Sequence, residues 1–323
     1  MKQFILGIDI AKNKFDVVLL DNEKQRHRIF SNCSEGFEQL SAWLVKQQVE
    51  KVHACLEVTG TYGEALGSYL YQTGHQVSMV NPLCIQAFGQ SQLTRNKTDK
   101  VDAKIIALYC QSQNPEPWSP LPTEIRELQA LVRRLDDLME MRHQEMNRIK
   151  ASCHLKSVQD SLENVVEYLE QQIKTIKNLI GQHIQQHPLL LEQQELLISI
   201  PGIAETTAAK LLAEIPNLKD YKTARQAAAY AGLTPQQRVS GTSVRGKSCL
   251  SKKGNSRVRK ALYMPAVVAQ RHNPIIQQFR DRLRQKGKHP MAILGALMRK
   301  LLHIVYGVLK TGKPFDPDYG LIS

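Results

Sequence analysis

The sequence predicts an α/β N-terminal domain, followed by long helices and a mainly helical C-terminal part. Two apolar, β-rich runs, Phe4 to Ile10 and Phe15 to Leu20, are joined by a polar connection short enough for a hairpin. Later β-rich runs at Val52 to Val58 and His75 to Val80 alternate with stretches of helical spacing. Beyond them, Thr123 to His187 is long and polar, with leucines at helical intervals, which predicts one or two long helices.

The charge of the chain is strongly positive. Its 323 residues include 43 lysines and arginines against 30 aspartates and glutamates, a formal net charge of +13. This excess favours a polyanionic partner, either nucleic acid or an anionic membrane surface. The most apolar late stretch, Met291 to Leu309, is interrupted by Arg299, Lys300 and His303, which are costly to bury in a bilayer. We therefore expect a packed helix there, nucleic acid as the partner, and no membrane.

The sequence predicts neither a signal peptide for export nor a metal site built from cysteines. Asp9 interrupts the apolar N-terminal run, where a signal peptide needs a continuous apolar core. The six cysteines form no CxxC pair, so we expect free thiols rather than a zinc site or a disulfide framework. Both observations favour a cytoplasmic protein.

Two carboxylates stand at the ends of predicted strands. Asp9 ends the first strand, and Glu57 comes at the end of the run that starts at Val52. A hairpin followed by alternating strands and helices, with acids at strand ends, is the plan of the ribonuclease H-like fold. In that fold the two strands are neighbours, so we expect Asp9 and Glu57 to lie side by side.

A second pair of carboxylates begins a predicted helix. Asp99 and Asp102 are three residues apart, so they share one face of its first turn. Taken alone, each is explained as an acid that caps the helix or stabilises its dipole. Together with Asp9 and Glu57 they give four carboxylates at one edge, enough to hold two Mg²⁺ ions. Cations near this pair are expected to bind phosphate, namely Arg95, Lys97, Lys100 and Lys104.

Prolines mark the end of the first domain. Residues 113–122 include four prolines, which cannot continue a helix. We place the ribonuclease H-like domain at 1–112, a linker with coiled-coil helices at 113–190, and a C-terminal domain at 191–323. The helices of the middle part form an arm that either dimerises the protein or spans two domains as a solvated helix. Its apolar positions include Leu128, Leu131, Leu135 and Leu138.

The stretch from Glu192 to Ile215 has the pattern of a helix-hairpin-helix. Two helical segments are separated by a tight turn that contains Gly202. The free backbone N–H groups at such a turn can bind a phosphate of nucleic acid without reading its sequence. A plain helical hairpin used only for packing explains the same pattern equally well.

A loop of small and basic residues follows at Ser240 to Ser248. Its small residues allow close backbone approach, and Arg245 and Lys247 supply positive charge, which suits contact with a phosphate. A flexible basic loop without a site is the equal alternative. The helices predicted beyond Asn255 carry eleven further cations with Tyr263 and Phe279 among them, a composition suited to a nucleic-acid face.

With these residues assembled, the chain resembles the insertion-sequence-110 family of DEDD transposases, which are related to the Piv-type DNA invertases. The resemblance covers almost the whole length, and the order and spacing of its motifs make it specific. The segments that carry it are Gly7 to Lys12, Glu57 to Tyr62, Arg95 to Ala103, and Ala231 to Pro235 with Ser240 to Gly246.

The resemblance implies a RuvC-like domain, a coiled-coil arm and a C-terminal transposase domain with a catalytic serine. Asp9, Glu57, Asp99 and Asp102 match the metal-binding tetrad, which implies two Mg²⁺ ions per site, with Mn²⁺ as a substitute. Ser240 matches the serine that attacks the scissile phosphate and forms a covalent phosphoserine link to one DNA strand.

The same resemblance implies the partners. They are donor and target DNA, a structured guide (bridge) RNA that pairs with both, and further copies of the chain in a dimer or tetramer whose active sites are shared. A bacterial, nucleoid-associated location follows from these partners.

Several alternatives stay open on the sequence. Ser243 is a rival nucleophile by position, and the base that activates the serine is not identified. A RuvC-like junction nuclease would use a metal-activated water and no serine. A sugar-kinase or actin-like ATPase also opens with a Gly-Ile-Asp strand, but its later glycine-rich nucleotide loops are missing here. A non-catalytic nucleic-acid-binding protein would account for the charge alone.

Overall fold

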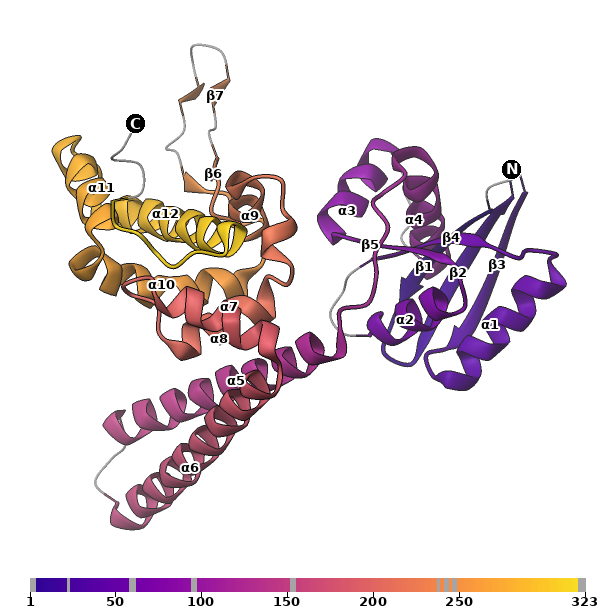
Figure 1. Cartoon of the computed structure of the whole chain (residues 1–323). Helices are drawn as coiled ribbons and strands as arrows, with labels where there is room; N and C mark the ends of the chain where they lie inside the picture. The colour runs from indigo at the N-terminus through magenta and orange to yellow at the C-terminus, as the bar shows by residue number, and fades with distance from the viewer. Residues whose placement is uncertain are drawn as a thin grey trace. The chain divides into compact units, whose positions relative to one another are not determined.

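The computed structural model divides the chain into two compact units, Met1–Pro120 and Leu121–Ser323, called here the N-terminal and C-terminal units. Figure 1 shows a sheet with helices in the first and helices almost throughout the second. The division into three domains at 112 and 190 stays a prediction. The residues that the structure describes are 4–21, 24–57, 62–93, 98–151, 155–236, 239–240, 244–245 and 249–318.

The N-terminal unit is built on a five-stranded mixed sheet in the order β3-β2-β1-β4-β5. Strand β2 is antiparallel to both β1 and β3, whereas β1, β4 and β5 are parallel. The hairpin and the alternation of strands and helices expected from the sequence are therefore present, as expected for a ribonuclease H-like domain. The strands are β1 (Phe4–Ile10), β2 (Lys14–Asp21), β3 (Lys24–Ser31), β4 (Val52–Glu57) and β5 (Gln76–Val80).

Helices cover both faces of this sheet, because the side chains of β1 alternate between two hydrophobic clusters. Leu6 and Ile8 pack in the cluster that includes Leu40 of α1 and Leu66 of α2. Ile5 packs in the cluster of α3 and α4, so Asp9 belongs to the α4 face by alternation. The helices are α1 (Ser34–Lys46), α2 (Glu64–Gln72), α3 (Pro82–Ser91) and α4 (Asp99–Gln113).

The C-terminal unit begins with a long helical hairpin. Helices α5 (Thr123–Ala151) and α6 (Lys156–Gln186) pack side by side (Figure 1), and Leu128 and Ile184 join them to the core of the remaining helices. That core also buries α7 (Pro188–Ile198), α8 (Glu205–Glu214), α9 (Ala224–Tyr230), α10 (Ser256–His272), α11 (Pro274–Gln285) and α12 (Pro290–Thr311).

Helix α12 is long and apolar enough to cross a membrane by length and composition. Its apolar side chains, Leu297, Leu301 and Val305 among them, are instead buried in the core of the C-terminal unit. The packed helix predicted at Met291 to Leu309 is confirmed.

A narrow β-hairpin leaves the helical core between α9 and α10. Its stem is β6 (Pro235–Gln236) paired with β9 (Cys249–Leu250), and its outer part is β7 (Val239–Ser240) paired with β8 (Val244–Arg245). Figure 1 shows this hairpin projecting from the helices of its unit. Of the loop predicted at Ser240 to Ser248, the structure describes Ser240, Val244 and Arg245, which lie in the paired strands β7 and β8.

Candidate active site

Asp9 and Glu57 end neighbouring strands at one edge of the sheet. In the parallel register of β1 and β4, Ile8 lies opposite Leu56, so the next residue on each strand is a carboxylate. Both side chains are partly exposed. The structure thus places this predicted pair side by side.

Helix α4 brings the second pair to the same edge. It lies directly on β1 because Gly7 has no side chain: a Cβ there would be 2.3 Å from the carbonyl oxygen of Ala103 and from the nitrogen of Ala107. Gly7 and Asp9 face the same side of the sheet, so the first turn of α4 comes next to Asp9. Thr98 caps this turn by accepting a 3.3 Å hydrogen bond from the Val101 N–H.

The four acids act on one another electrostatically. The pKa of Asp9 is raised to about 6, first because the carboxyl is partly buried and then because Asp102, Asp99, Glu57 and Asp16 are close. Because these carboxylates repel one another, a cation bound among them would be stabilised. Oxygen-only donors of this kind suit Mg²⁺ or Mn²⁺.

Carboxylate oxygens are suitable ligands for a divalent cation, but the four side chains do not converge on a single metal position. Among the described residues, no three His, Cys, Asp or Glu side chains form a group that could hold a metal ion as they stand. One reason is that Asp99 is engaged elsewhere, since its Oδ2 accepts a 2.7 Å hydrogen bond from Lys14 Nζ. This contact lowers the pKa of Asp99 and raises that of Lys14.

Three residues that the sequence analysis missed stand beside this cluster. Asp16 lies directly opposite Asp9 on β2 and is buried. Its Oδ1 is 2.7 Å from His27 Nε2 on β3, and its Oδ2 accepts a 3.4 Å hydrogen bond from Lys14 Nζ. The available signal was Asp16 itself, a carboxylate inside an otherwise apolar strand, which must find partners when it is buried.

The remaining predicted contacts of the N-terminal unit are placed only in part. Lys100 is exposed on the first turn of α4. Arg95 and Lys97 lie outside the described residues. Their contact with phosphate stays a prediction.

Ser240 belongs to the C-terminal unit, on the outer part of the hairpin. It lies opposite Val244, and Val239 lies opposite Arg245, so Ser240 and Arg245 sit on adjacent rungs of one short ladder. Lys247 and the rival nucleophile Ser243 fall outside the described residues.

Gly202 lies in the turn between α7 and α8, with φ of +104°. A Cβ there would meet Ala269 of α10 at 2.8 Å, so the glycine is required for helix packing. The first turn of α8 also carries an acid, Glu205, which opposes a phosphate at this helix end. These facts support packing as one role of Gly202, and its contact with nucleic acid stays a prediction.

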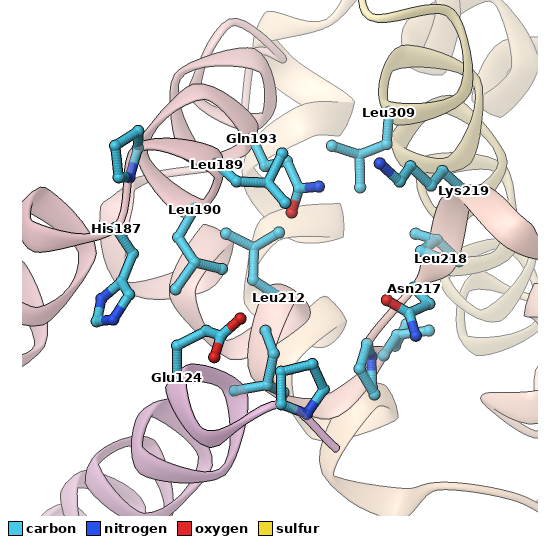
Figure 2. Close-up of a pocket in the computed structure, with 15 residues that line it drawn as sticks. Glu124, His187, Leu189, Leu190, Gln193, Leu212, Asn217, Leu218, Lys219 and Leu309 are labelled. Carbon is cyan, nitrogen blue, oxygen red and sulfur yellow. The ribbon is translucent and has the colours of Figure 1, made fainter. Parts of the chain in front are cut away.

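The C-terminal unit holds a cavity of about 260 Å³ that contains none of the predicted site residues. Figure 2 shows Leu189 and Leu190 of α7, Leu212 of α8 and Leu309 of α12 around it, with Glu124 and Lys219 as charged members. Its lining is mainly apolar, so it offers no cluster of groups for phosphate or metal chemistry.

The chain matches proteins of the DEDD transposase class. Residues 6–160 match the transposase family DEDD_Tnp_IS110, and residues 194–281 match the family described as "Transposase IS116/IS110/IS902 family". The pilin gene-inverting protein of Moraxella bovis is 35% identical over 320 residues, covering 98% of each chain. The transposase of insertion sequence element IS1328 from Yersinia enterocolitica is 24% identical, over 97% of this chain and 98% of the relative.

The chain therefore belongs to the IS110 family of transposases, which confirms the resemblance found in the sequence. Among solved structures, T. thermophilus RuvC in complex with Holliday junction substrate matches 36% of this chain and 99% of its own, with 16% identity and a TM-score of 0.28.

Proposed function

We propose that the chain recombines DNA by Mg²⁺-dependent strand cleavage and rejoining, with Asp9, Glu57, Asp99 and Asp102 as the metal-holding residues and Ser240 as the nucleophile. The observation that carries the proposal is the parallel register that places Asp9 beside Glu57, together with the close contact of Gly7 with α4, which brings Asp99 and Asp102 to the same edge of the sheet. The repulsion among these carboxylates, which Lys14 offsets only in part, favours a bound metal cation.

The acids divide into two roles. Glu57 and Asp9 are fixed by strands, whereas Asp99 and Asp102 are carried by the first turn of a helix, so all four would hold the metal from two different elements. When bound, Mg²⁺ supplies positive charge that offsets the charge on the phosphate being attacked. Lys14 is the residue that must release Asp99 before this carboxylate can serve as a ligand.

The serine step exchanges one phosphodiester bond for another. The Ser240 hydroxyl loses its proton and its Oγ bonds to phosphorus, while the bond from phosphorus to one sugar oxygen breaks and that oxygen takes up a proton. The phosphoserine link keeps the bond energy for rejoining when a strand end attacks it. Arg245 and Lys247 stabilise the negative charge of the crowded phosphate.

The partners of this reaction are donor DNA, target DNA and a structured guide RNA, with sequence choice residing in base pairing. Because the acids and Ser240 belong to different units of the chain, a dimer or tetramer can combine the acids of one copy with the serine of another. The pilin gene-inverting relative supports DNA inversion or insertion as the outcome. A bacterial cytoplasm is the compartment that holds these partners.

A recombination assay tests this proposal. Protein and candidate guide RNA are incubated with Mg²⁺ and a plasmid that carries donor and target sites, and the products are sequenced across the junctions. Rejoined strands in inverted or inserted order are expected, with loss of product in EDTA, after ribonuclease treatment, or with Glu57→Gln. Cut strands that are never rejoined would instead indicate a junction nuclease.

A further inference from the structure

A second cavity, of about 670 Å³, lies between α12 and the stem of the hairpin that carries Ser240. We call it the α12 groove; its lining includes Phe279, Met291, Gly295, Arg299, Lys300 and His303. Gly295 fixes the stem against the helix, because a Cβ there would be 3.0 Å from Leu250 of β9. The groove therefore adjoins the base of the hairpin, whose stem forms one of its walls.

The two ends of the groove differ in chemistry. Met291, which is 61% exposed, and Gly295 leave apolar surface on the first turns of α12, and the ring of Phe279 from α11 also lines the groove. Further along α12 come Arg299 and Lys300, about 12 to 14 Å from Met291 along the helix axis, and then His303, about 18 Å from it. A nucleotide has the same division, with an apolar base face at one end and an anionic phosphate at the other.

The cationic end lacks a counter-charge. None of the described residues that line the groove is acidic, and in that part of the chain no ion pair joins Lys252, Arg299 or Lys300 to a carboxylate. The Nε2 atom of His303 is buried without a hydrogen-bond partner. Burial, followed by the nearby cations Arg299, Lys300 and Arg225, lowers the pKa of His303. An anion placed here would pair with the cations of the groove.

Lys252, at the stem side of the groove, is held in an unusual backbone conformation. Its φ is +54°, a left-handed conformation that glycine or asparagine adopts at lower cost. Its N–H donates a 3.2 Å hydrogen bond to the carbonyl oxygen of Gly232, which fixes that conformation. The exposed side chain of Lys252 thus starts from a fixed backbone position at the wall of the groove.

We propose that the α12 groove binds an unpaired nucleotide of the DNA strand that is cut, with its phosphate against Arg299, Lys300 and Lys252 and its base against Met291 and Phe279. DNA is the occupant because the groove adjoins the hairpin of Ser240, and in this respect the inference rests on the proposed function. A nucleotide held here keeps the neighbouring phosphate beside the hairpin.

The test measures binding by the full-length protein in EDTA, where no strand is cut. The probe is a fluorescein-labelled oligothymidylate of about twelve nucleotides, compared by anisotropy with a blunt duplex of the same length. The groove variant is Arg299→Gln with Lys300→Gln. The matched control is Lys286→Gln with Lys288→Gln, which removes the same charge from exposed positions after α11 that do not line the groove.

We expect the groove variant to bind oligothymidylate about tenfold more weakly, while the control loses less than about threefold and both lose duplex binding equally. The inference is overturned if the two variants lose the same affinity for oligothymidylate, or if the groove variant loses the same affinity for oligothymidylate and for the duplex. A variant that loses oligouridylate while keeping oligothymidylate also overturns it, because the occupant would then be RNA.

A crosslinking measurement on the unaltered protein does not depend on how a variant folds. An oligothymidylate that contains 5-iododeoxyuridine is irradiated with the protein, and the crosslinked peptide is identified by mass spectrometry. A crosslink at Phe279 or Met291 supports the inference, and crosslinks confined to other segments contradict it. If wild type recombines DNA but the groove variant binds oligothymidylate as tightly as wild type does, only this inference fails. If the groove variant loses oligothymidylate binding as expected but wild type recombines no DNA, only the proposed function fails.

Discussion

Asp9 in the N-terminal unit and His303 in the C-terminal unit are both half-buried ionisable groups surrounded by charges of their own sign. Four neighbouring carboxylates add to burial in raising the pKa of Asp9 to about 6. Three neighbouring cations add to burial in lowering the pKa of His303. In each case the charged form of the residue is destabilised, and a ligand of opposite sign would relieve it.

The difference between the two regions lies in what already offsets the charge. In the N-terminal unit Lys14 reaches both Asp99 and Asp16, so the acid cluster contains a cation of its own. In the α12 groove no described lining residue is an acid. A metal at the acid cluster would have to displace the ammonium group of Lys14 from Asp99, whereas a phosphate in the α12 groove would displace no carboxylate of the described lining.

The largest expected effect breaks the acid cluster directly. Asp102 is the neighbouring carboxylate whose charge raises the pKa of Asp9 most. We expect Asp102→Asn to lower strand cleavage by about 10³-fold or more, because a metal ligand is lost. Glu64→Gln, at an exposed position on the first turn of α2, is the matched control and should cleave normally. Cleavage products are quantified on denaturing gels, and near-normal cleavage by Asp102→Asn would remove this residue from the metal site.

The next effect tests how α4 is held over the sheet. Gly7→Val places a side chain where Ala103 and Ala107 already pack, so we expect a loss of about 2–3 kcal/mol of stability along with cleavage. Gly181→Ala, in α6 where a Cβ meets nothing, should instead stabilise by about 0.5–1 kcal/mol. Chemical denaturation measures both, and an unchanged Gly7→Val protein would show that α4 is not fixed by this contact.

A smaller effect sharpens the role of Lys14. Because its ammonium group competes with a metal for Asp99, Lys14→Met should bind Mg²⁺ about two- to fivefold more tightly. Lys12→Met removes an exposed lysine in the same turn and should bind as wild type does. Isothermal titration with MgCl₂ gives both affinities. Weaker binding by Lys14→Met would mean that Lys14 positions Asp99 for the metal instead.

The smallest effect is a pH dependence of stability. The pKa of Asp9 is raised on folding, so its ionised form costs stability that appears as the pH rises from about 4 to above 6. In EDTA, Asp9→Asn should therefore exceed wild type in unfolding free energy at about pH 7, by about 1 kcal/mol after discounting solvent screening, and match it near pH 4. Thermal melts across this range check the trend, and an advantage that grows toward low pH would have the wrong sign.

The four acids could be predicted because their signals are local. Asp9 and Glu57 follow recognisable buried strands, and the spacing of Asp99 and Asp102 defines a helix face without knowledge of the fold. Strand β3 has a weaker sequence signal, because its side chains are mostly exposed or half-exposed and show little periodicity. Helix α3 was not predicted at all.

Other features depend on contacts between distant segments, which sequence patterns do not report. Asp16 meets His27 only through strand pairing, and the α12 groove forms only where Leu250 meets Gly295. The turn at Gly202 was compatible with phosphate binding or with plain helix packing, and only the fold shows its tight contact with Ala269 of a distant helix. Periodicity predicts what an element buries, but not which partner it meets.

The central claim is that Ser240 attacks DNA with the help of the N-terminal carboxylates. It is tested most directly by trapping the covalent protein–DNA adduct under denaturing conditions and mapping the attachment site by mass spectrometry. We expect a Mg²⁺-dependent phosphoserine at Ser240 that persists in Ser243→Ala and is absent from Ser240→Ala and Asp102→Asn. DNA that is cut normally by Ser240→Ala, with no adduct in any variant, would contradict the claim and indicate attack by water.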